Sequence, residues 1–220
     1  MSFNTPSLRP PFLATWLIGQ FASDWQAEAI SGDLLEEPSG LAAKSGVAYA
    51  RRWYWRQSMK TVVDLMGSGF RTAPWLIAGT VIGGYLLLAF GYSLPERLIV
   101  AVLELRRHHV IPYYTRHEMD AHVFWLNTGT LIGSLLVSLF VGCIMAVVAK
   151  AREMVATLTL SVLLFALTVV AWFNVARHWP ERAIPLPIML INLAQKILIP
   201  IGGVMVRQVK RTAGRWHLSV

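Results

Sequence analysis

The chain has 220 residues, of which 55% are hydrophobic and 15% are charged, and its formal net charge is +8 at pH 7. A soluble domain carries about 25% charged residues, so this composition indicates a membrane protein and argues against a soluble one. The basic excess does not indicate a nucleic-acid partner, because the basic residues cluster beside apolar segments, where they would meet anionic lipid headgroups.

The first element expected is a helix over the apolar residues 12–21, which follow Arg9, Pro10 and Pro11. A cleaved signal peptide would share the basic residue and the apolar stretch. However, Gln20 interrupts the stretch, and prolines are typical of the first positions of a helix. We therefore expect an uncleaved amphipathic helix here.

Two more helices are predicted before the first membrane span. Ser23 and Gln26 have the spacing of a capping box, which predicts a helix that runs to about Glu37 and ends at residues 38–40. The next helix should cover residues 41–70, because apolar residues recur there at helical spacing along one side. These apolar residues are Trp55, Met59, Val62, Met66 and Phe70.

The same predicted helix carries an aromatic and basic segment, residues 51–57, of the kind that favours a membrane–water interface. We interpret it as an interfacial anchor in preference to a docking surface for a partner. The anchor residues are Arg52, Trp53, Tyr54, Trp55, Arg56 and Lys60. We interpret the acidic residues of segment 32–37 as ion-pair partners of these arginines rather than as metal ligands.

Two segments, GDLLEE at residues 32–37 and ARRWYWRQ at residues 50–57, resemble the permease prefix domain found ahead of acidobacterial FtsX-like (MacB-type) ABC transporter permeases. The resemblance covers residues 10–60 and implies a transporter-associated setting in the bacterial inner (cytoplasmic) membrane, without a catalytic residue. Such permeases carry a large extracytoplasmic domain, whereas the outer connections expected here are short. The chain also has no Walker A motif, so an ATP-driven role would need a separate ATPase.

Four stretches are long and apolar enough to cross about 30 Å of hydrocarbon, which takes roughly 20 helical residues. They cover residues 74–93, 123–148, 154–176 and 185–206. We therefore predict an all-α integral membrane protein. A small cytoplasmic helical prefix, residues 1–72, would precede a four-helix transmembrane bundle, residues 73–220.

The outer connection between the first two spans, residues 94–122, begins with another capping-box pattern at Ser93 and Glu96. The apolar segment that follows, residues 98–105, is too short to cross a bilayer. We expect a short helix on or near the outer surface, with a lid over a cavity as the functional alternative.

The orientation follows from the basic residues, which are retained on the cytoplasmic side of membrane proteins. With the N-terminus inside, thirteen of the 20 Lys and Arg residues fall in cytoplasmic segments and six in outer connections, and the last is Lys196 within a span. Both termini are therefore expected to be cytoplasmic.

Lys196 lies near the middle of the fourth span, where a charge costs a few kcal/mol unless it is paired, neutralised or hydrated. No acidic residue is expected at a comparable depth, and Asn192 lies one helical turn earlier. Three interpretations stay open: a lysine satisfied by polar neighbours or reaching the interface, a substrate or proton site, and a salt bridge to another subunit. Other polar candidates, on the second span, are Asn127, Thr128, Ser134 and Ser138.

Two Gly-x-x-x-Gly patterns offer small faces that permit close helix approach. One is formed by Gly79 and Gly83 in the first span, and the other by Gly129 and Gly133 in the second. We expect these glycines to pack against helices of this chain, with packing against a partner as the alternative.

Five of the six histidines fall on the expected outer side: His108, His109, His117, His122 and His178. With neighbouring carboxylates they would offer ligands for zinc or copper. The spacing of His117 and His122 does not match the metalloprotease pattern, which needs two histidines four residues apart. We interpret the histidines as solvated surface residues and expect no metal or cofactor.

The function expected from these observations is that of a non-catalytic multi-pass subunit of a transport-related or other multisubunit membrane assembly. Its partners would be anionic lipid and other membrane subunits. An autonomous small transporter or channel, with Lys196 in its pathway, is the first alternative. A redox protein that holds a metal or haem through the outer histidines is the second.

Overall fold

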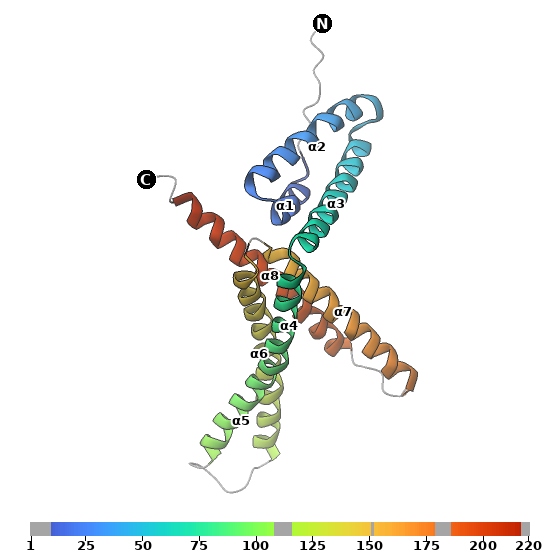
Figure 1. Ribbon diagram of the computed structural model, residues 1–220. Helices are drawn as coiled ribbons and strands as arrows, with labels where there is room; N and C mark the ends of the chain where they lie inside the picture. The colour runs from blue at the N-terminus through green and yellow to red at the C-terminus, as the bar shows by residue number, and fades with distance from the viewer. Residues whose placement is uncertain (1–9, 108–115, 151, 179–185, 217–220) are drawn as a thin grey trace. The chain divides into compact units, whose positions relative to one another are not determined.

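The computed structural model describes residues 10–107, 116–150, 152–178 and 186–216. Within these ranges the chain forms eight helices and no strand, as the all-α prediction requires (Figure 1). The chain divides into two compact units, Met1–Pro74 and Trp75–Val220, near the boundary expected at residues 72 and 73.

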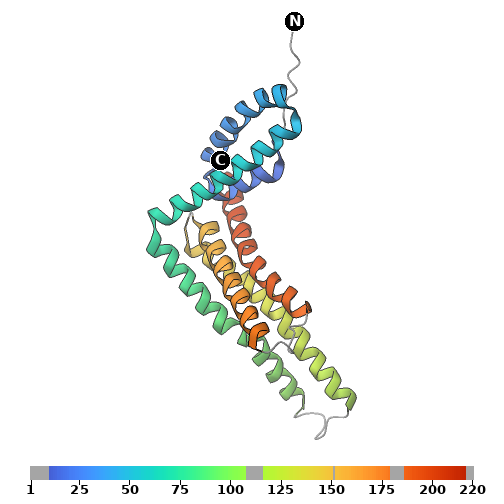
Figure 2. The ribbon, with the colours of Figure 1, turned by 90° about the vertical axis from the view of Figure 1, so that its right-hand side faces the viewer.

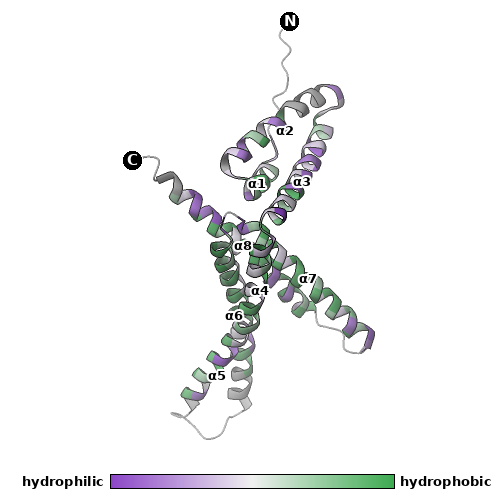
Figure 3. Cartoon of the chain, viewed as in Figure 1, coloured by the Kyte–Doolittle hydropathy of each residue, from purple (hydrophilic) through white to green (hydrophobic). Residues whose placement is uncertain are grey.

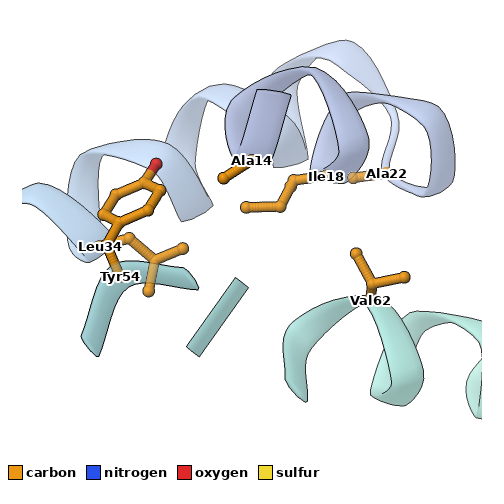
Figure 4. Close-up of a cluster of buried hydrophobic side chains, with 6 residues drawn as sticks. All are labelled: Ala14, Ile18, Ala22, Leu34, Tyr54 and Val62. Carbon is orange, nitrogen blue, oxygen red and sulfur yellow. The ribbon is translucent and has the colours of Figure 1, made fainter. Parts of the chain in front are cut away.

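The first unit contains α1 (Phe12–Phe21), α2 (Asp24–Ser45) and α3 (Val47–Thr72). Helices α1 and α2 both pack against α3. Buried side chains of this unit point toward one another and form a hydrophobic core (Figure 4). This core consists of Ala14, Ile18, Ala22, Leu34, Tyr54 and Val62.

The boundary between α2 and α3 differs from the expected one. Helix α2 does not end at residues 38–40 but continues to Ser45. The break falls at Gly46, whose φ of 86° lies in the left-handed region that favours glycine. At the start of α2, half of the predicted capping box is present, because the backbone N–H of Ser23 donates to Gln26 Oε1 over 3.2 Å.

The buried face of α3 is centred one position away from the predicted apolar stripe. It contains Ala50, Tyr54, Ser58 and Val62, whereas Met59 of the predicted stripe is 50% exposed. The hydroxyl of Ser58 donates to the carbonyl of Tyr54 over 2.8 Å, so a polar residue can occupy the core at little cost. An apolar pattern alone does not reveal such a position.

The second unit contains four candidate membrane spans, each long and apolar enough to cross a bilayer. By length and composition, these helices are compatible with the predicted multi-pass membrane protein. Figure 3 shows hydrophobic residues dominating α4, α6 and α7, in contrast to α3. Five described helices form these four candidate spans, because the first span, Pro74–Val102, covers α4 and part of α5. The helices are α4 (Pro74–Gly91), α5 (Ser93–Arg107), α6 (Arg116–Val148), α7 (Glu153–His178) and α8 (Leu186–Trp216).

Helix α5 begins at Ser93, where the capping-box pattern predicts a helix, and it packs against one of the candidate spans. It follows α4 after Tyr92 alone and runs beside the N-terminal part of α6 (Figures 1 and 2). Its Ile99 and Pro95 cover Gly129 and Gly133 of α6. Because Gly133 lies within the second predicted span, α5 packs against a candidate membrane helix.

Helices α6 and α8 make the closest contact in the bundle. A Cβ atom added to Gly202 of α8 would lie 2.5 Å from the carbonyl oxygen of Leu139 and 2.8 Å from the backbone nitrogen of Cys143. A Cβ atom on Gly142 of α6 would clash with the carbonyl oxygen of Ile199. The two backbones therefore touch where glycine stands on each helix, as small residues allow in membrane helices.

Helices α7 and α8 are joined at one end of the bundle by an ion cluster. The carboxylate of Glu153, the first residue of α7, is 2.7 Å from Lys210 Nζ and 3.9 Å from Arg207 Nη1. The Glu153 side chain is only 5% exposed, which makes these cations necessary partners. The turn before it contains Lys150, whose φ is 36°.

Candidate functional site: polar residues within the membrane bundle

Lys196 lies on α8 and is 8% exposed, so the chain itself covers most of this side chain. Its Nζ donates to Asn192 Oδ1 over 3.2 Å, and the amide of Asn192 donates to the carbonyl of Ile188 over 3.0 Å. The backbone carbonyl of Lys196 accepts a hydrogen bond of 2.7 Å from Ser161 on α7. The sequence-based pairing of Lys196 with Asn192 is therefore present.

A second polar group joins α6, α8 and Tyr92, which lies between α4 and α5. The amide of Gln195 donates to Ser134 Oγ over 2.8 Å, and Ser138 Oγ donates to the carbonyl of Ser134 over 2.9 Å. Tyr92 lies 3.0 Å from Ser138 Oγ. Since a serine hydroxyl has a single proton, Tyr92 is the donor in this last bond.

Ser134 and Ser138 were among the candidate partners of Lys196, yet they bond to different residues. The reason lies in the geometry of α8, on which adjacent residues point in directions about 100° apart. Gln195 faces Ser134 on α6, while the ammonium of Lys196 turns back to Asn192. Among the described residues, the hydrogen bonds thus form two polar groups on α8, and Lys196 belongs to one of them.

A cleft of about 380 Å³ lies next to Ser134 and is bounded by α5, α6 and α8. Its polar residues are Glu96, Asn127, Thr130 and Ser134, and its apolar walls are Leu126, Leu131, Ile188 and Ile191. Asn127, selected from the sequence as a partner of Lys196, therefore faces this cleft instead. Glu96 supplies a carboxylate close to the polar groups of α6.

The two glycine pairs have different surroundings. Gly129 and Gly133 pack within the chain, against α5. No described atom comes within 4 Å of a Cβ atom added to Gly79 or Gly83. These two glycines instead line a groove of about 260 Å³ between α4 and α6. In the described part of the chain, the small face of α4 is therefore uncovered.

The interfacial anchor expected in α3 is only partly available. Arg52, Arg56 and Lys60 are exposed and follow one another at four-residue spacing on the helix. Tyr54 is fully buried in the core of the first unit, so its assignment as an anchor is corrected. Its hydroxyl is 3.4 Å from that of Thr15 on α1.

The structure also differs from two further expectations for this anchor: the exposure of its tryptophans and its ion pairs with the acidic segment. Trp53 and Trp55 are partly buried against the same core, so the basic residues form most of the exposed surface of the segment. Asp33 forms no ion pair with the described arginines of α3. The side chains of Glu36 and Glu37 lie outside those that the structure describes.

The expected histidine site lies largely outside the described residues, which include neither His108 nor His109 and give no side-chain position for His117 or His122. His178 is exposed, and its Nδ1 is 2.9 Å from the carbonyl oxygen of Asn174. In the parts of the chain that are described, no three His, Cys, Asp or Glu residues come together as metal ligands.

The sequence pattern did not reveal Tyr92 and Gln195 as members of the second polar group, or Glu96 as a residue of the cleft. Its spacing from Ser93 predicts a helix cap for Glu96, at the start of a short helix outside the bundle. The available signal was the four-residue spacing of Ser134, Ser138 and, one turn earlier, Thr130 on a single face of α6. A polar stripe inside an apolar span indicates a polar partner on the facing helix.

The bundle therefore offers hydrogen-bonding groups within its spans, an uncovered small-residue groove and an ion cluster at one end. A search of family models, curated proteins and solved structures found no match to this chain.

Proposed function

We propose that this protein is a non-catalytic subunit of a transport-related membrane assembly in the bacterial inner membrane, with both termini in the cytoplasm. The groove between α4 and α6 is the observation that carries this proposal. It presents Gly79, Thr80 and Gly83 on the first span, where another helix can approach the backbone closely.

The open packing of the bundle supports the same proposal. Only 22% to 33% of the residues in the most apolar windows of the four spans are buried within the chain. Much of the apolar surface is therefore left for lipid and for partner helices. A stripe of small residues offers little contact area to flexible lipid chains but suits the rigid surface of a helix.

Lys196 is a weaker candidate for the contact with a partner. Its side chain is 8% exposed and its ammonium already donates to Asn192, so a carboxylate of another subunit would have to displace neighbouring helices. We assign the partner contact to the α4 groove, and we assign the basic residues of α3 to anionic lipid headgroups.

The transport-related setting is supported by the two segments that resemble a permease prefix domain, residues 32–37 and 50–57. In the first unit these segments belong to α2 and α3, which pack against each other. An ATP-driven assembly would require its ATPase as a separate subunit.

The test is purification of the protein from native membranes in mild detergent, followed by mass spectrometry of the proteins that accompany it in fixed ratio. Gly79→Ile should lower the recovery of a membrane partner at least ten-fold, because the larger side chain fills the groove. The matched control is Ala78→Ile, which adds a larger side chain at the neighbouring exposed position of α4. Recovery of the chain alone, after crosslinking as well as without it, would refute the subunit proposal.

The alternative of an autonomous transporter or channel is favoured by one observation, the polar groups that lie inside the spans. Tyr92, Ser138 and Gln195 are hydrogen-bonded within the bundle near the α8 turn that bears Lys196. Polar residues inside membrane spans often mark a transport pathway. Lys196→Met would then abolish flux into proteoliposomes and leave complex recovery intact, whereas unchanged flux would exclude Lys196 from the pathway.

A further inference from the structure

The cleft bounded by α5, α6 and α8 has the properties of a ligand site. Its volume of about 380 Å³ lies within the range of small-molecule pockets, roughly 300 to 1,000 Å³. Four apolar residues form its walls, and a few polar side chains converge on it. The polar members come from two helices, Glu96 from α5 and the others from α6.

Three of these polar side chains have unused hydrogen-bonding capacity. Among the described residues, Glu96 forms no ion pair, and Asn127 and Thr130 have no hydrogen-bond partner. Ser134, at the inner part of the cleft, is already engaged with Gln195. A ligand would therefore meet one carboxylate together with an amide and a hydroxyl oxygen.

The position of the cleft along the bundle places it in one half of the membrane. Ser134 is fourteen residues from Val148 at the end of α6, and Asn127 is seven residues further on. At 1.5 Å per residue these positions lie about 21 and 31 Å from that end. The cleft thus extends from inside the hydrocarbon to its boundary, which is about 30 Å away.

The chemistry of the cleft selects a class of ligand. A single carboxylate among acceptor oxygens favours a cation, and the Leu and Ile walls favour an apolar body attached to it. A bare Mg²⁺ or Ca²⁺ ion needs more oxygen ligands than the cleft offers and fewer apolar neighbours than its walls provide. We propose that this cleft binds organic cations, in which an ammonium-type group faces Glu96 and an apolar portion packs against α6 and α8.

Two sources can supply this chemistry, a free organic cation and the headgroup of an ethanolamine lipid. The experiment uses the purified full-length protein in nanodiscs of phosphatidylglycerol, titrated with radiolabelled tetraphenylphosphonium. A second arm repeats the titration in nanodiscs that also contain phosphatidylethanolamine. Weaker binding in the second arm would identify the lipid as the natural ligand, and unchanged binding would identify a free cation.

The variant that tests the site is Glu96→Gln, which keeps the size of the side chain and removes its charge. Its control is Glu104→Gln on the same helix, an exposed carboxylate that does not line the cleft. We expect saturable binding by the wild type and by Glu104→Gln. The affinity of Glu96→Gln for the cation should be lower than that of the wild type by a factor of about ten or more. Should Glu96→Gln not be recovered folded, Asn127→Leu, which removes an acceptor from the cleft, should weaken binding several-fold.

Three results would overturn the proposal. The first is equal affinity of the wild type and Glu96→Gln, and the second is the absence of saturable binding in the wild type. The third is equally tight binding of triphenylphosphine oxide, a neutral compound with a similar apolar body, because the charge of the ligand would then be irrelevant.

Discussion

At the scale of single residues, the environment of Lys196 is the most informative feature. An ammonium at the centre of a bilayer costs about 2.5 to 3.5 kcal/mol on insertion scales. A single hydrogen bond, such as that to Asn192, contributes only about 0.5 to 1.5 kcal/mol. The hydrogen bond therefore offsets part of the cost.

This balance predicts an energetic coupling between the two residues. Asn192→Leu leaves the buried ammonium without its acceptor and should lower the free energy of unfolding by about 1 to 3 kcal/mol. In a Lys196→Met background, the same substitution should cost about 0.5 kcal/mol or less. Unfolding of the purified protein by SDS in mixed micelles measures both values.

The Lys196→Met protein is itself the control for folding, since Met has a similar length and no charge. Replacement of a buried polar group by an apolar one of similar volume is often neutral or stabilising. Equal costs of Asn192→Leu in both backgrounds would show that the hydrogen bond in the structure contributes nothing measurable to stability.

At the scale of helices, glycine decides which pairs approach closely. Gly142 and Gly202 bring α6 and α8 into backbone contact, whereas Gly79 and Gly83 contact no other described helix. The same residue type therefore serves the internal core on α8 and an open groove on α4. The sequence pattern could not separate these roles, because the spacing of glycines does not show whether another helix packs against them.

The two environments predict opposite effects of an added side chain. Gly202→Val should destabilise the bundle by about 1 to 3 kcal/mol or more, because its Cβ would meet the backbone of α6. Gly79→Val should change the stability of the isolated protein by no more than about 0.5 kcal/mol. Thermal unfolding in detergent, followed by circular dichroism, measures the two variants side by side.

The comparison also tests the groove. A large destabilisation by Gly79→Val in the isolated protein would mean that α4 packs through this face inside the chain, contrary to the open groove between α4 and α6. If Gly202→Val lowered the stability of the bundle only slightly, the result would contradict the backbone contact between α6 and α8.

At the scale of the whole molecule, our proposal has four membrane spans, which would bring the two termini to the same side of the membrane. The excess of basic residues in the N-terminal unit, the turn between α6 and α7 and the end of α8 predicts, as we propose, that this side is the cytoplasm. The ion cluster of Glu153, Arg207 and Lys210 lies at the same end of its unit as that turn.

Reporter fusions test this orientation. Green fluorescent protein fused after Trp216 should be fluorescent, and alkaline phosphatase fused there should be inactive, because phosphatase needs an oxidising compartment. A phosphatase fusion within residues 108–115 is the matched outer control and should be active. An active phosphatase at Trp216 would invert the assignment or change the number of spans.

The sequence by itself determined the class of this protein, the four spans and the helical character of the N-terminal unit. Apolar runs of about 20 residues allow few other structures, because unpaired backbone groups are too costly in hydrocarbon. The start of α1 and the pairing of Lys196 with Asn192 were predictable too, since they rest on local spacing within one helix.

Only the tertiary structure decided which faces meet. Because α5 packs along α6, Glu96 lines the same cleft as Asn127 and Thr130. Tyr54 is buried in the core of the first unit and does not lie at the expected membrane interface. The lining of the cleft and the burial of Tyr54 both depend on contacts between residues far apart in the chain. Local hydrophobic periodicity does not encode such contacts. The open groove beside Gly79 was likewise decided by where the other helices pack.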